Sequence, residues 1–123
     1  MKLLWMLGAL DAALAVALGA FGAHGLKEKV SAARLDVWHT ACEYQFYHAL
    51  GILLVVLLAQ QFSTQLLTSG WVLLAGSLIF SGSLYLLVLT DTPWLGAITP
   101  IGGVTLIAGW CILAWQVFRS VQV

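Results

Sequence analysis

The chain has 123 residues, of which 62% are hydrophobic and only 8% are charged, with five Lys or Arg balanced by five Asp or Glu. A soluble domain is about one quarter charged, so this composition cannot cover a water-facing surface and indicates an integral membrane protein. A formal net charge of zero also argues against a nucleic-acid partner, because phosphate binding needs a surplus of Lys and Arg on one face.

Four apolar runs are each long enough to cross a bilayer, which takes about 20 residues. They lie near residues 3–23, 42–61, 70–90 and 98–118 and leave room only for short connections. The second break is polar and uncharged, whereas the third carries Asp91 and Pro93. Pro100 falls in the first turn of the last run, where its missing N–H is tolerated. We therefore predict an all-α integral membrane bundle of four transmembrane helices, forming a single domain over residues 1–123.

The segment between the first two runs holds half of the charged residues, namely Lys27, Glu28, Lys29, Arg34 and Asp36. Apolar residues recur through it at spacings of three and four, as they do on one face of an amphipathic helix. We expect an amphipathic interfacial helix near residues 26–40, between the first and second spanning helices, with Trp38 at headgroup depth.

Most of the other polar residues are expected in one leaflet, because successive spanning helices alternate in direction. Helices one and three end on the side of the first loop, and helices two and four begin there. This places six polar side chains together in depth: His24, Tyr44, His48, Ser83, Tyr85 and Thr99. Such groups usually face the bundle interior, pair with each other or line a wet cavity. The cluster is therefore either a ligand-binding site or a set of hydrogen bonds that holds the helices together.

Asp11 lies near the middle of the first run among apolar neighbours, where a carboxyl group should be neutral or paired. By depth, the nearest basic candidate is His48. Asp11 is then either a proton or cation site, or a neutral acid that hydrogen-bonds across helices. His39 and Glu43 are four residues apart, which suits two metal ligands but equally an ordinary helix pair. We expect neither a metal nor another cofactor.

Four ordered segments resemble a known family. They are Gly19-Ala-Phe-Gly-Ala-His24-Gly-Leu, Trp38-His-Thr-Ala with Tyr44 and His48, Phe80-Ser-Gly-Ser-Leu-Tyr85, and Thr99-Pro-Ile-Gly-Gly103 with Gly109-Trp110. The chain resembles the YgdD-like family of small bacterial inner-membrane proteins, a domain-of-unknown-function family with transmembrane relatives in eukaryotes. The resemblance covers nearly the whole chain. It implies a four-helix, multi-pass protein of the inner (plasma) membrane without an established activity.

The function expected from the sequence is that of a non-enzymatic membrane protein. Its polar cluster would bind a small ligand, a lipid headgroup or a partner helix, the last from a second copy of the chain or from another membrane protein. The alternative is a small proton-coupled transporter or channel that uses Asp11. An enzyme is disfavoured because no nucleophile and base have a recognisable catalytic spacing.

Overall fold

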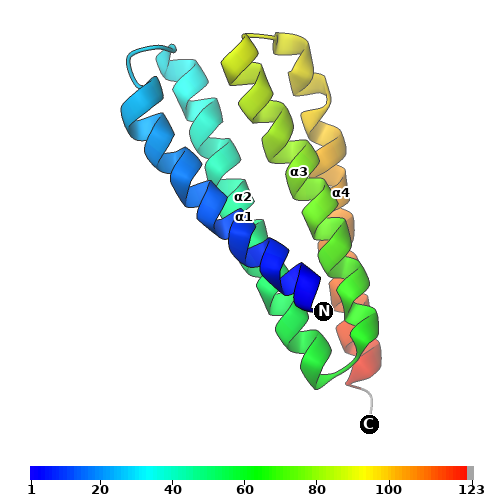
Figure 1. Cartoon of the computed structure of the whole chain (residues 1–123). Helices are drawn as coiled ribbons and strands as arrows, with labels where there is room; N and C mark the ends of the chain where they lie inside the picture. Colours follow the sequence, from blue (N-terminus) through cyan, green and yellow to red (C-terminus); the bar gives the residue numbers. More distant parts are fainter. Residues whose placement is uncertain (122–123) are drawn as a thin grey trace.

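The computed structural model describes residues 1–121 and contains four long helices (Figure 1). Helix α1 spans Lys2–Phe21 and continues into a π-helical turn, η1, at Gly22–Leu26. Helix α2 spans Ala32–Gln61, α3 spans Leu67–Thr90 and α4 spans Thr99–Ser120; short 3-10 turns at Thr64–Leu66 (η2) and Pro93–Ala97 (η3) precede the last two. All four helices are long and apolar enough to cross a membrane. The prediction of an all-α bundle with four spanning helices is confirmed.

Consecutive helices are spatial neighbours: α1 packs on α2, α2 on α3 and α3 on α4, while α1 touches α3 only slightly. Figure 1 shows the N-terminus, the described end of α4 and the α2–α3 connection at one end of the bundle. We call this the chain-end side. The α1–α2 and α3–α4 connections lie at the other end, the first-loop side.

The interfacial helix expected near residues 26–40 does not exist as a separate element. Leu26 closes the π-helical turn, and a new helix starts at Ala32 after Ser31, whose hydroxyl accepts a hydrogen bond from the Arg34 backbone N–H at 3.2 Å. From there α2 runs without interruption to Gln61, because no proline or glycine pair breaks it. Residues 32–40 instead form the first turns of α2, where Trp38 is buried, Leu35 and Val37 are partly buried and Ala33 is exposed.

The α3–α4 connection follows the turn chemistry of its residues. Asp91, directly after α3, has a φ of 49° and a ψ of 48°, a left-handed conformation that ends the helix. Pro93 then opens η3, and Pro100 lies in the first turn of α4, as predicted. Short connections of this kind force neighbouring helices to run antiparallel.

The buried apolar side chains form two clusters, one in each half of the bundle. The chain-end cluster includes Leu4, Ile52 and Leu73, and the first-loop cluster is centred on Trp38 with Leu87 and Val88. Many large side chains on the outside are apolar as well, which suits contact with lipid. The buried polar side chains described below lie largely between the two clusters.

Glycines allow the closest helix contacts. A Cβ on Gly102 would lie 2.7 Å from the Cα of Phe80, so α4 and α3 touch through their backbones there. A Cβ on Gly22 would lie 2.6 Å from Nε1 of Trp38, whose indole donates a hydrogen bond to the Leu18 carbonyl at 2.8 Å. The π-helical turn thus lies where the Trp38 ring docks on the end of α1, and both sites need a residue without a side chain.

Candidate functional site

Three side chains from three helices form one hydrogen-bonded chain in the middle of the bundle. The Tyr85 hydroxyl of α3 donates to Oε1 of Gln45 in α2 at 2.5 Å, and Nε2 of Gln45 donates to Oδ1 of Asp11 in α1 at 2.7 Å. Gln45 is only 4% exposed. In this arrangement Gln45 accepts from Tyr85 and donates to Asp11, so both donors of the chain point toward Asp11.

A small cleft of about 120 Å³ opens beside this chain, between α1 and α3. Its polar lining comes from Asp11, Gln45, Tyr85 and the serine hydroxyls of Ser77 and Ser81, and leucine side chains form the rest of the wall. Within residues 1–121, Oδ2 of Asp11 is inaccessible to solvent and has no hydrogen-bond partner. A buried carboxyl oxygen of this kind is rare in a folded protein, so Asp11, which lines the cleft, has unused hydrogen-bonding capacity.

A second polar group joins α2 to α4. Nδ1 of His48 lies 2.6 Å from the Tyr44 carbonyl oxygen, and the Trp110 indole Nε1 donates to Nε2 of His48 at 3.2 Å. A carbonyl can only accept and an indole N–H can only donate, so His48 carries its proton on Nδ1 and is neutral. Both ring nitrogens are occupied within the bundle, and His48 therefore acts as a connector between helices.

Hydroxyl groups make two further links between helices. Ser83 of α3 and Thr99 of α4 lie 2.6 Å apart through their oxygens, and Ser83 also donates to the Phe80 carbonyl at 2.9 Å. The Ser81 hydroxyl donates to the Ala41 carbonyl of α2 at 2.7 Å. Each link satisfies a hydroxyl that would otherwise be unpaired in an apolar environment.

The remaining predicted residues lie on the outside. His24, His39, Glu43 and Tyr44 are all exposed, although the Tyr44 ring also stacks near that of His48 at a centroid distance of 6.0 Å. No three His, Cys, Asp or Glu side chains within residues 1–121 are close enough to form a metal site. The six residues expected to cluster are therefore divided among three separate interhelical contacts and the outer surface.

Comparison with known proteins shows the family to which the chain belongs. The family described as "Protein of unknown function (DUF423)" matches residues 18–103. The chain belongs to this family. It is similar to the UPF0382 membrane protein YwdK of Bacillus subtilis, with 50% identity over 115 residues (92% of this chain, 94% of the relative). It is also similar to a UPF0382 membrane protein of Staphylococcus haemolyticus, with 47% identity over 121 residues (98% and 99%). No solved structure matches significantly.

The relatives are named as membrane proteins, and this DUF423 chain has four spanning helices, so it is a multi-pass membrane protein. Gln45, His48 and Tyr85 lie inside the stretch that matches the family, whereas Asp11 lies before it. The Asp11–Gln45–Tyr85 chain thus combines residues from the matched part with one from outside it.

Sequence reasoning missed Gln45, although it is the central residue of the site. By depth, His48 is the nearest basic candidate for Asp11, but the ring nitrogens of His48 contact Tyr44 and Trp110, and Gln45 is the residue that hydrogen-bonds to Asp11. The available signal was a glutamine in an apolar span at a depth similar to that of Asp11. Uncharged amides also hydrogen-bond across membrane helices, so an acid in a span can be paired without a basic residue.

Proposed function

We propose that this DUF423 chain is a non-enzymatic membrane protein that binds a small ligand in the cleft between α1 and α3, through Asp11. The observation that carries the proposal is the unpartnered Oδ2 of Asp11 beside a cleft of about 120 Å³. The sequence predicts a ligand-binding cluster of six polar residues. The proposed site is smaller and lies around Asp11, Gln45 and Tyr85.

The direction of the hydrogen bonds indicates which ligands suit the cleft. Tyr85 donates to Gln45, and Gln45 donates to Oδ1 of Asp11, so with Asp11 as a carboxylate the chain ends on an acceptor, Oδ2. A ligand that supplies a donor, such as a hydroxyl or an amine, would satisfy this oxygen after a rotation of the Asp11 carboxylate that exposes Oδ2 to the cleft. The cleft volume limits the buried part of the ligand to a few non-hydrogen atoms, so a small donor group fits better than a whole lipid headgroup.

A binding test can use three probes of equal length: n-propylamine, n-propanol and propionate. In the detergent-solubilised full chain, we expect the amine and the alcohol to raise the thermal unfolding temperature and the propionate anion, which has no donor, to leave it unchanged. A ligand at ten times its Kd stabilises by about 1.4 kcal/mol, which is a shift of several degrees for a chain of this size.

Two glycines supply a matched pair of variants for this test. Gly82 lines the cleft, and a Cβ there would meet no atom within 4 Å, so Gly82→Leu extends into open space and fills the cleft. Gly19 has equally open surroundings but does not line the cleft. We expect Gly82→Leu to abolish the amine-induced shift and Gly19→Leu to keep it. Equal shifts in both variants, or no difference among the probes, would contradict the proposal.

A proton-coupled transporter or channel is the second candidate, supported by the position of Asp11. Ionisable residues within spanning helices mark proton relays in membrane proteins, and serine and tyrosine hydroxyls line the cleft beside Asp11. In vesicles with a trapped pH-sensitive dye, Asp11→Asn should then abolish proton flux. Glu43→Gln, which neutralises an exposed acid of α2, serves as the control. Absence of flux in the wild type, or unchanged flux in Asp11→Asn, refutes this candidate.

The narrower membership in the YgdD-like family is also a proposal, supported by the four ordered segments of this sequence. Membership in this family would also imply a location in the inner membrane. The exposed apolar faces are available to lipid or to another copy of the chain. Cross-linking in native membranes would distinguish these two neighbours.

A further inference from the structure

The two ends of the bundle differ in their charged side chains. All five acidic residues lie at the middle or on the first-loop side: Asp11, Glu28, Asp36, Glu43 and Asp91. The chain-end side holds two basic side chains, Lys2 and Arg119, and neither Asp nor Glu. This end therefore presents cations without acidic side chains that would neutralise them.

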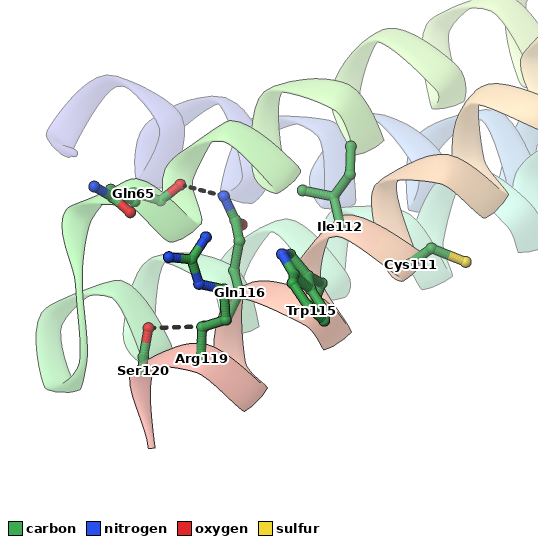
Figure 2. Close-up of a pocket in the computed structure, with 7 residues that line it drawn as sticks. All are labelled: Gln65, Cys111, Ile112, Trp115, Gln116, Arg119 and Ser120. Carbon is green, nitrogen blue, oxygen red and sulfur yellow. Dashed lines mark hydrogen bonds between the residues drawn. The ribbon is translucent and has the colours of Figure 1, made fainter. Parts of the chain in front are cut away.

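Arg119 lines a cavity of about 570 Å³ at the chain-end side, between the last turns of α4 and η2 (Figure 2). Figure 2 shows its guanidinium group directed toward Gln65. Nε2 of Gln116 donates to the Gln65 carbonyl at 2.8 Å, which ties α4 to the α2–α3 connection. Ser120 adds a hydroxyl to the lining. The end of the cavity near Arg119 thus offers a cation and several neutral polar groups.

The same cavity has an apolar wall that continues toward the bilayer centre. Ile112 and Trp115 lie on it, respectively about two turns and one turn before Arg119 in α4, and the Trp115 side chain is 60% exposed. Tryptophan at the end of a spanning helix usually lies at headgroup depth. The cavity therefore combines a polar part in the headgroup region with an apolar part at acyl-chain depth.

At the other end of the bundle, one basic side chain is neutralised by an acid. There Arg34 pairs with Asp91 at 3.3 Å, and this is the only Lys or Arg ion pair with an acid within residues 1–121. A second cavity on the chain-end side, of about 550 Å³, repeats the chemistry of the first with Lys2, Gln60 and Trp5. A cation, an amide and a tryptophan thus occur together twice on the same side.

From this arrangement we infer that the cavity at Arg119 binds the phosphate of an anionic phospholipid. The guanidinium group supplies N–H donors in the fork geometry that suits phosphate oxygens. The Gln65 side-chain amide lies in the same lining for the remaining headgroup oxygens, whereas the Ser120 hydroxyl already donates to the Gln116 carbonyl at 2.7 Å. The acyl chain would lie along Trp115 and Ile112. This lipid site is independent of the proposed ligand cleft at Asp11, which lies in the middle of the bundle.

Native mass spectrometry of the full chain in detergent tests the inference. The protein is mixed with equal amounts of phosphatidylglycerol and phosphatidylcholine of the same acyl composition, and the ratio of the two bound lipids is measured. We expect the wild type to prefer phosphatidylglycerol and Arg119→Gln to lower that preference about fivefold, the ratio that corresponds to about 1 kcal/mol per basic residue at an anionic surface. Lys29→Gln, which removes one exposed cation from the first-loop side, should leave the preference unchanged.

Three results would overturn the inference. Equal binding of the two lipids by the wild type would show that charge is not recognised. An equal loss in Arg119→Gln and Lys29→Gln would show that only the overall charge of the protein matters. Displacement of phosphatidylglycerol by millimolar inorganic phosphate would identify a site for free phosphate in place of a lipid. Because Arg119 is exposed, Arg119→Gln should keep the fold, which unchanged circular dichroism would verify.

Discussion

Replacing Gln45 with methionine tests whether the buried hydrogen-bonded chain stabilises the bundle. Methionine has nearly the volume and flexibility of glutamine but neither donates nor accepts as an amide does. The substitution removes the bond from Tyr85 at 2.5 Å and the bond to Asp11 at 2.7 Å together. It leaves a hydroxyl and a carboxyl oxygen without partners, while the packing changes little.

The expected loss of stability follows from those two groups. A buried polar group without a partner costs about 1–3 kcal/mol, whereas hydrogen bonds between membrane helices contribute on average only about 0.6 kcal/mol, and about 1.7 at most. Asp11 and Tyr85 are only partly buried, so the lower part of the first range applies to each. We therefore expect Gln45→Met to lower the free energy of unfolding by about 2 kcal/mol.

Unfolding of the full chain by SDS in mixed micelles, followed by circular dichroism, measures this difference. Gln61→Met at the exposed end of α2 is the control, and it should change the free energy by less than about 0.5 kcal/mol. A double-mutant cycle with Tyr85→Phe isolates the Gln45–Tyr85 hydrogen bond. When the Tyr85 hydroxyl is already absent, Gln45→Met should lower the free energy of unfolding by about 1 kcal/mol less. A loss below about 0.5 kcal/mol for Gln45→Met, or strictly additive effects, would refute the reasoning.

Two further predictions concern α4. Gly102→Ala places a Cβ against the backbone of Phe80 and should destabilise the bundle by about 3 kcal/mol, because backbones cannot yield as side chains do. The adjacent Gly103→Ala meets only the edge of the Phe80 ring at 3.8 Å and should be neutral or slightly stabilising in the same SDS titration. For His48, the ¹⁵N chemical shifts of the imidazole should report a neutral ring protonated at Nδ1, and Trp110→Phe should change the shift of Nε2 only. An Nε2–H tautomer would mean that the hydrogen bond from Trp110 is absent.

The candidate site could be predicted from the sequence only in part. Asp11 and Tyr85 were both singled out, because polar groups in an apolar span are few and energetically costly. That they belong to one hydrogen-bonded chain was not foreseen, since Gln45 joins them and lies 34 residues from Asp11 and 40 from Tyr85 in the sequence. Depth along the bilayer can be counted from a sequence, but the direction in which each helix faces cannot.

Composition and local pattern alone determined that the chain is a membrane protein with four spanning helices. Run length indicated the spans, and the residues at Asp91, Pro93 and Pro100 marked the third connection and the start of α4. These features depend on the bilayer thickness and on backbone geometry, which act on each segment separately.

Only the tertiary structure decided which side chains meet. In a bilayer, lipid tails are as apolar as a leucine-rich core, so the hydrophobic pattern does not specify which face of a helix points inward. The rotation of each helix is set by close contacts such as Gly102 against Phe80 and by links such as His48 to Trp110, which are 62 residues apart. For that reason the site at Asp11 becomes visible only when all the helices are packed together.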